Sequence, residues 1–290
     1  MMKDQLQRFL FEDFQIRGEI ANADNSFREL LANHNYTEEV RNLMGELLIA
    51  ATLLTAMLKF EGKITVQLQG DGPLKMAVIN ISQDLVLRGT ANVDGETSGL
   101  SFAQLVGEGH LMISITPKNG ERYQGIVALD KTSLSACIEN YFAQSEQLAT
   151  RIILHANSQN NMQCAGLLLQ TLPMADVEEK EHDDDFQHVC ALAHTVKATE
   201  LYELTHDELL FRLYHQDKVR LFDEQSIIYQ CSCSKERCIS SLASIQPKEI
   251  LEILKEESVI EMHCEYCAKD YRFDINDLQI LLTDTNEQQH

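Results

Sequence analysis

The first part of the chain shows apolar residues at helical spacing. Phe9, Leu10 and Phe14 recur at intervals of one helical turn or less, and the apolar run 47–58 continues the pattern. This run is too short to cross a bilayer and predicts a buried helix. We therefore expect residues 1 to about 60 to be helical.

Short segments rich in β-forming residues follow, and they predict paired strands. The segments are 63–69, 74–82, 110–117, 122–129, 151–156 and 165–172. The turn GDGP separates the first two segments, and a short Lys-Asn-Gly sequence separates the next two, so each pair is expected to form a hairpin. A helix over 133–147 stands between the strands. Helices and hairpins segregated in this way predict an α+β fold rather than a doubly wound sheet.

The composition changes at residue 176. The run DVEEKEHDDD, 176–185, holds seven acidic residues and one lysine, which is typical of a solvated linker. An amphipathic helix over 186–196 follows, and a capping box from Thr205 to Glu208 begins another helix. Helices this short depend on tertiary packing for their stability. We expect a metastable helical linker over 176–226.

The remaining residues predict a small separate domain. Its strands are expected at IIYQ, VIEMH and YRF, and its helices begin near Ser234, Pro247 and Asn276. The chain is therefore expected to have three parts: an N-terminal domain of β-hairpins and helices (1–175), the helical linker (176–226) and a C-terminal domain (227–290).

The formal net charge of −21 restricts the possible partners. Such an acidic surface repels phosphate backbones and anionic lipid, so neither nucleic acid nor membrane is an expected partner. The N-terminus has no continuous apolar stretch typical of a signal peptide, and a cytoplasmic protein is expected. In that reducing compartment, clustered cysteines are more often metal ligands or redox groups than permanent disulfides.

Five of the eight cysteines lie within the 37 residues 231–267. Two close pairs, Cys231-x-Cys233 and Cys264-x-x-Cys267, are separated by 30 residues. Two such pairs can present four thiolates tetrahedrally, as a structural zinc ion requires, so one Zn²⁺ per monomer is expected. Because alternate residues of an extended chain point to opposite faces, the chain must turn at Ser232 to direct both sulfurs of the first pair toward one metal.

Other potential ligands are weaker candidates. Cys238 is expected on the helix that begins near Ser234, outside the tetrahedron, and His263 could also ligate. A plant-type iron–sulfur cluster would need a cysteine at position 241, where the chain has serine. The isolated residues Cys137, Cys164 and Cys190 lie in apolar surroundings and are expected in the core.

Four protein ligands leave no open position for a substrate or water, so the zinc is not expected to be catalytic. The chain also lacks the GxSxG, Walker and GxGxxG motifs, and an enzyme is not expected. Zinc-bound thiolates are nevertheless oxidisable, and their oxidation removes the ligands of the metal. Since metal binding contributes to folding, a site made only of cysteines can act as a redox switch.

Several stretches of this chain resemble the redox-regulated 33-kDa heat-shock chaperonin family of cytosolic holdases. The stretches are VQLQGDGPL (66–74), GERYQG (120–125), RLYH (212–215), CSCSKERC (231–238) and MHCEYC (262–267). The similarity runs nearly end to end. It implies an N-terminal substrate-binding and dimerisation domain, a metastable linker and a C-terminal zinc-binding redox sensor.

The same resemblance implies the roles of individual residues. Cys231, Cys233, Cys264 and Cys267 would bind zinc in the reduced state. On oxidation they would form the disulfides Cys231–Cys233 and Cys264–Cys267, release zinc and unfold the linker. The partners would be unfolded or partly unfolded client proteins, and the oxidised, active form would be an ATP-independent homodimer.

Two other classes of protein remain compatible with the cysteine pattern. A thiol-disulfide oxidoreductase could use Cys264-x-x-Cys267 catalytically, but it would place this motif in a thioredoxin-like βαβ unit. A zinc-finger adaptor could use the site only for structure and bind another protein. The negative charge of the chain argues against the nucleic-acid-binding form of such an adaptor.

Overall fold

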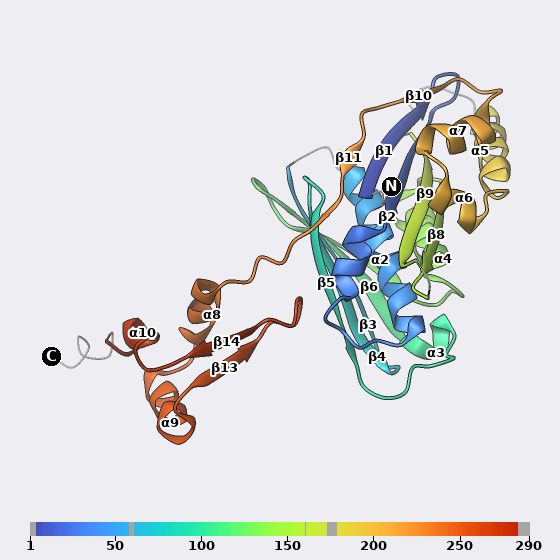
Figure 1. Ribbon diagram of the computed structural model, residues 1–290. Helices are drawn as coiled ribbons and strands as arrows, with labels where there is room; N and C mark the ends of the chain where they lie inside the picture. Colours follow the sequence, from blue (N-terminus) through green and yellow to red (C-terminus); the bar gives the residue numbers. More distant parts are fainter. Residues whose placement is uncertain (1–3, 58–60, 160, 173–178, 284–290) are drawn as a thin grey trace. The chain divides into compact units, whose positions relative to one another are not determined.

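The computed structural model describes residues 4–57, 61–159, 161–172 and 179–283 of the chain. Helices and strands are mixed along these residues, which confirms the α+β class (Figure 1). The chain divides into two compact units, Met1–Gln230 and Cys231–His290, and each is described by itself. Among the described helices, none has both the length and the apolar character needed to cross a membrane.

Two six-stranded sheets form the framework of the first unit. The strands of the first sheet are β1 (Asp4–Phe11), β2 (Ile16–Ala23), β8 (Thr150–Asn157), β9 (Gln163–Thr171), β10 (Val219–Leu221) and β11 (Gln225–Ser226). Those of the second are β3 (Gly62–Gly70), β4 (Leu74–Ser82), β5 (Val86–Val93), β6 (Gly109–Pro117), β7 (Tyr123–Ala128) and β12 (Ile228–Tyr229). The first sheet has the order β10-β1-β2-β9-β8, with β11 also on β1, and the second has the order β12-β5-β4-β3-β6-β7.

A long helix, α2 (Glu38–Ala56), packs against both sheets and lies between them (Figure 1). Its residues Leu47 to Leu54 are all buried, which confirms the expected buried helix. The apolar inner faces of the two sheets and α2 form the main core of the unit. The shorter helices are α1 (Asn25–Leu31), α3 (Phe102–Val106), α4 (Leu134–Tyr141) and the π-helix η1 (Phe142–Glu146).

The helical prediction for the start of the chain was wrong for residues 4–23, which form the strands β1 and β2 and the turn between them. Phe9 and Phe11 of β1 belong to one buried cluster and Leu6 to another, because both faces of this sheet are covered. A strand buried on both faces lacks the simple alternation of apolar and polar positions, so its pattern does not distinguish it from a helix. Residues 1–3 and 58–60 of the prediction lie outside the described residues.

The two expected hairpins are confirmed as β3–β4 and β6–β7, and the strands expected at 151–156 and 165–172 are present as β8 and β9, which pair with each other. The helix expected over 133–147 is also present, although its second half is the π-helix η1. The sequence pattern missed β5 and α3, and within the expected linker it missed α6 (Ala198–Glu203), β10 and β11. Strand β5 contains Gly89 and Asn92, two residue types that are uncommon in strands and lower its β-propensity.

Three helices from the expected linker cover the outer face of the first sheet (Figure 1). They are α5 (Glu179–Ala193), α6 (Ala198–Glu203) and α7 (His206–Tyr214). The capping box is present, with the Glu208 amide donating to Thr205 Oγ1 over 3.2 Å. Val189 and Leu209 of these helices share a buried cluster with Phe11 of β1. Residues 176–178 of the acidic run lie outside the described part of the chain.

The second unit is small. It contains α8 (Lys235–Leu242), α9 (Pro247–Glu257), β13 (Ile260–His263), β14 (Asp270–Phe273) and α10 (Gln279–Thr283). Helix α9 begins at Pro247, as its sequence predicts, and β13 pairs with β14 in a two-stranded sheet. Ile250, Phe273 and Leu278 are almost fully buried in its core. A core of this size gives limited stability by itself, so an additional cross-link is expected here.

Candidate metal centre

Cys231 and Cys233 lie in the extended segment between β12 and α8. Ser234 is the N-cap of α8, and its hydroxyl accepts a hydrogen bond from the Arg237 amide. The Arg237 guanidinium donates to the Ser232 carbonyl over 2.7 Å and also contacts the Ser232 hydroxyl. These hydrogen bonds from Arg237 of α8 fix the backbone at Ser232. This is the position where a turn was expected, so that the sulfurs of Cys231 and Cys233 point toward one metal.

The second pair lies in the tight connection from β13 to β14. The Cys264 amide donates to the Lys269 carbonyl over 3.0 Å, and the Ala268 amide donates to the Cys264 carbonyl over 2.8 Å. Ala268 has a φ of 55°, in the left-handed region that non-glycine residues seldom adopt. The backbone therefore closes into a knuckle that presents the Cys264 and Cys267 side chains together.

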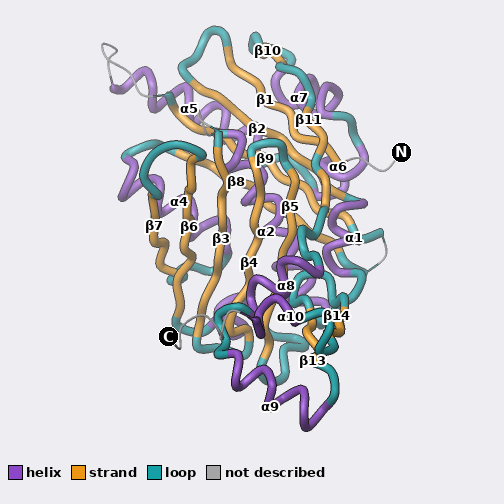
Figure 2. The backbone as a smooth tube through the Cα atoms, turned by 90° about the vertical axis from the view of Figure 1, so that its left-hand side faces the viewer, coloured by secondary structure: helices purple, strands orange, loops and turns teal. Residues whose placement is uncertain are grey.

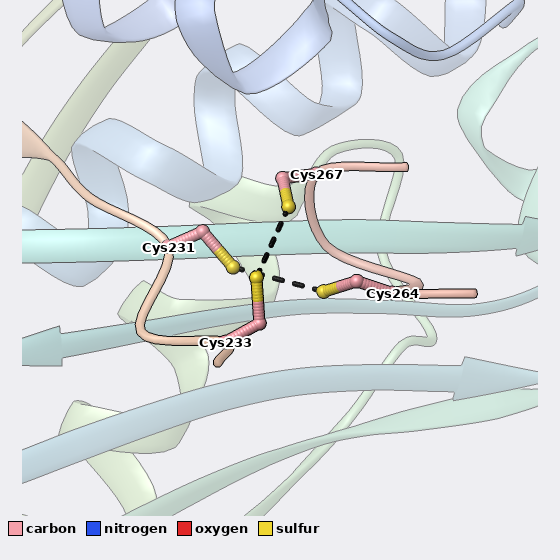
Figure 3. Close-up of side chains that lie close together, drawn as sticks. All are labelled: Cys231, Cys233, Cys264 and Cys267. Atoms are coloured by element: carbon pink, nitrogen blue, oxygen red, sulfur yellow. Dashed lines mark hydrogen bonds between the residues drawn. The ribbon is translucent and has the colours of Figure 1, made fainter. Parts of the chain in front are cut away.

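The two pairs converge on one point (Figure 3). The Sγ atoms of Cys231 and Cys264 are 3.7 Å apart, and those of Cys233 and Cys267 are 3.4 Å apart. All four sulfurs lie within 4.8 Å of one another. Residues separated by 30 positions in the chain thus form a single four-sulfur cluster.

The separations fit a tetrahedral metal. Zn–S bonds of about 2.3 Å in a regular tetrahedron place the sulfurs about 3.8 Å apart. The Sγ–Sγ distances of 3.7 and 3.4 Å fall just below this value, and the donor set is made only of cysteine sulfur, which soft thiophilic metals prefer. The cluster could therefore hold a metal ion of the zinc type with little rearrangement.

The electrostatics of the cluster are asymmetric. Two opposing effects act on the pKa of the Cys233 thiol. Burial raises it, but hydrogen bonds from Tyr271, Cys267 and the other two thiols lower it by more, and the net result is a pKa of about 7. Burial raises the pKa of Cys267 to about 12 and also raises that of Cys231. A divalent cation bound between the four sulfurs would compensate the charge of all four thiolates.

Two residues that support the cluster were missed by the sequence reasoning. Tyr271 of β14 donates a hydrogen bond to Cys233 Sγ over 3.1 Å, and Arg237 holds Ser232 as described above. Nothing in the spacing of the cysteines indicates either contact. Tyr271 reaches the first cysteine pair only because the β13–β14 hairpin folds over it.

The other candidate ligands are not part of the cluster. Cys238 lies on α8, as expected, and contacts the small core from a partly exposed position. The His263 side chain is paired with Asp270, whose Oδ1 is 2.7 Å from Nδ1. The isolated residues Cys137, Cys164 and Cys190 are buried in the first unit, which confirms that they are core residues.

Comparison with known proteins identifies the class of this chain. The family model described as "Hsp33 protein" matches residues 4–274. A "33 kDa chaperonin" of Shewanella sediminis is 50% identical over 286 residues, which cover 98% of each chain. A "33 kDa chaperonin" of Aeromonas salmonicida is 47% identical over 283 residues, which cover 97% of this chain and 95% of the relative.

The fold agrees with these matches. The crystal structure of the 33 kDa chaperonin from Thermotoga maritima superposes with a TM-score of 0.82, at 20% identity, over 97% of this chain and 99% of that one. Together the matches place the chain among the heat-shock chaperones. It belongs to the Hsp33 family, and the resemblance found in its motifs is confirmed.

Proposed function

We propose that this chain is an ATP-independent holdase, which binds unfolded or partly unfolded client proteins and is activated when a zinc centre is oxidised. One observation carries the proposal: four cysteine sulfurs from two distant segments lie within 4.8 Å of one another in a small unit. Membership of a heat-shock chaperone family supports the client class.

In the reduced state, Cys231, Cys233, Cys264 and Cys267 would bind one Zn²⁺, which would hold all four sulfurs as thiolates. An oxidant such as a peroxide would take two electrons from each cysteine pair, forming the disulfides Cys231–Cys233 and Cys264–Cys267 with release of the metal. Their short loops favour closure within each pair. The small core would then lose a stabilisation on the order of 10 kcal/mol, comparable to the whole stability of a small domain.

The switch would act through the segment 176–226, between an N-terminal substrate-binding and dimerisation domain (1–175) and a redox domain (227–290). The linker helices have 15, 6 and 9 residues, and their apolar side chains are buried against the first sheet. Helices of this length depend on that packing, so their release would expose apolar surface. We propose that the oxidised protein is a cytoplasmic homodimer.

An oxidoreductase is the main alternative, and the position of Cys264-x-x-Cys267 does not support it. The motif lies in the connection between two antiparallel strands, β13 and β14. Redox-active CxxC motifs of the thioredoxin type belong instead to a βαβ unit. We therefore propose a binding protein without catalytic turnover. A zinc-finger adaptor, the other alternative, would have the same four-cysteine site but would not be activated by oxidation.

Reduced and oxidised protein should be compared in two measurements. Light scattering of a heat-denaturing client reports holdase activity, and amide hydrogen exchange reports unfolding. We expect only the oxidised protein to suppress aggregation and to lose protection over the C-terminal unit and part of 176–226. If the oxidised protein keeps this protection, or suppresses aggregation no better than the reduced protein, the proposal is wrong.

A further inference from the structure

We propose that the outer edge of β7 binds an extended segment of the client as an added β-strand. The inference rests on the proposed holdase function and names a surface for it. Strand β7 is the last strand of the second sheet, and among the described strands it pairs with β6 alone (Figure 2). Extended peptides commonly bind by adding a strand to such an edge.

The edge of β7 lacks the features that usually prevent strand addition. Its sequence YQGIVA contains no charged residue and no proline, and its pairing with β6 has no bulge. The side chains of Gln124, Ile126 and Ala128 lie on its solvent face and are exposed, and Ile126 keeps 67% of its full accessible surface. Soluble proteins usually protect edges with charges, prolines or bulges, so an unprotected apolar edge indicates a binding surface.

The direction of the backbone amides follows from the ladder. The Leu129 amide donates to the Gly109 carbonyl of β6 over 3.1 Å, and residues of an antiparallel strand alternate in the side to which their amides point. The amides and carbonyls of Gly125 and Val127 therefore point toward β6. Those of Gln124, Ile126 and Ala128 point outward, in the plane of the sheet, where an added strand would find them.

The edge is held in place from behind. Gly125 faces the ring of Tyr141 of α4, which a Cβ at this position would overlap, and Val127 is buried. The hydroxyls of Tyr123 and Tyr141 both donate to Glu146 Oε1 over 3.0 Å. These contacts fix β7 before a client arrives, which lowers the conformational cost of binding.

At the opposite edge of the same sheet, the outward backbone groups of β5 are already hydrogen-bonded within the fold, in contrast to those of β7. Strand β12 pairs with Val86 and Leu87 of β5. Further along β5, the Tyr36 hydroxyl accepts from the Ala91 amide over 2.9 Å and donates to the Ala91 carbonyl over 3.0 Å. The fold therefore occupies outward backbone groups of β5 with its own residues.

A client segment fits the β7 edge better than a second copy of this chain. A strand of six residues is much shorter than the roughly 20–30 residues per side of a stable protein interface. Two copies would also each carry a formal charge of −21. Backbone hydrogen bonds, in contrast, are independent of the client's sequence, which suits a protein that must bind many unfolded chains.

The substitution Ile126→Pro tests the edge directly. It removes an amide that points outward and leaves the hydrogen bonds to β6 unchanged, a position where edge strands tolerate proline. Ile126→Ala is the matched control, since it removes the apolar side chain but keeps the amide. The probe is reduced, carboxymethylated α-lactalbumin, a permanently unfolded protein. We expect the oxidised Ile126→Pro variant to bind it about tenfold more weakly than the Ile126→Ala variant.

Amide hydrogen exchange of the oxidised wild-type protein gives a second measurement that needs no variant. We expect the probe to protect the amides of Gln124, Ile126 and Ala128, while those of Gly125 and Val127 are protected without it. Equal binding by the two variants, or no gain of protection at the outward amides, would overturn the inference. So would protection that appears without probe as the protein concentration rises, because it would indicate self-pairing.

The two proposals can fail separately. If the wild-type protein suppresses aggregation but the outward amides gain no protection, the holdase stands and its client surface lies elsewhere. If the outward amides are protected by the probe equally in reduced and oxidised protein, the edge is confirmed and activation by oxidation is wrong.

Discussion

Tyr271 donates a hydrogen bond to Cys233 Sγ over 3.1 Å, and this contact joins the β13–β14 hairpin to the first cysteine pair. The same bond raises the pKa of the tyrosine, because the hydroxyl proton is held by the sulfur. The contact would support Cys233 as a proposed metal ligand, although Tyr271 itself does not belong to the proposed ligand set. Such supports commonly change metal affinity by about 10- to 100-fold.

We therefore predict that Tyr271→Phe weakens zinc retention about tenfold. The ring remains in the small core, so the loss would come from the hydroxyl alone. Competition with a chromophoric zinc chelator measures the effect, and Tyr123→Phe in the first unit is the control. Unchanged retention in Tyr271→Phe would show that the hydrogen bond does not support the centre.

The ligand assignment predicts different effects for two cysteines of the second unit. Cys264→Ser removes one sulfur of the cluster and should lose most of the zinc affinity, whereas Cys238→Ser should retain one zinc per reduced monomer. Metal analysis of the purified proteins, combined with thiol titration, measures both. The assignment is wrong if Cys238→Ser abolishes zinc binding while Cys264→Ser retains it.

The packing of the linker predicts that Leu209→Ala partly activates the reduced protein. Leu209 is 1% exposed in the cluster between α7 and the first sheet, and such a truncation costs about 2–5 kcal/mol. That loss should shift the linker toward its released form. Phe211→Ala is the control, because Phe211 lies on the same helix and is 73% exposed. In light scattering with a heat-denaturing client, reduced Leu209→Ala should suppress aggregation of the client, whereas reduced Phe211→Ala should not. If reduced Leu209→Ala is inactive, linker packing does not restrain the switch.

Glu19 predicts a pH dependence of stability. This residue of β2 is 2% exposed, and burial raises its pKa from 4.5 to about 7 despite the nearby guanidinium groups of Arg17 and Arg8. Between pH 4.5 and 7 the folded chain therefore binds more protons at this site than the unfolded chain. The stability contributed by the raised pKa is present below pH 4.5 and is lost as the pH rises through 7.

We expect Glu19→Gln to be more stable than the wild type at pH 8, by up to about 3 kcal/mol, with the advantage disappearing toward pH 4.5. Urea unfolding of the reduced proteins at several pH values measures the difference. Glu121→Gln, at an exposed position, should show no such trend. A stability difference for Glu19→Gln that does not change with pH would contradict the raised pKa.

Much of the cysteine cluster could be predicted from the sequence. Two close cysteine pairs in a small domain have few ways to be used, and the need for a turn at Ser232 follows from backbone geometry alone. The hairpins β3–β4 and β6–β7 and the strands β8 and β9 were predictable for a similar reason, since strand propensity and turn residues are local properties. The buried α2 was predictable from its length and continuous apolar character.

Tertiary structure decided the features that depend on which surfaces meet. Strands β1 and β2 could not be distinguished from a helix, because α2 covers one face of their sheet and α5–α7 cover the other, and burial on both faces removes the alternation. The contact of Tyr271 with Cys233 arises from the folding of a hairpin over a segment 38 positions away. The position of β7 at the end of the second sheet is likewise a property of strand order, which local sequence does not encode.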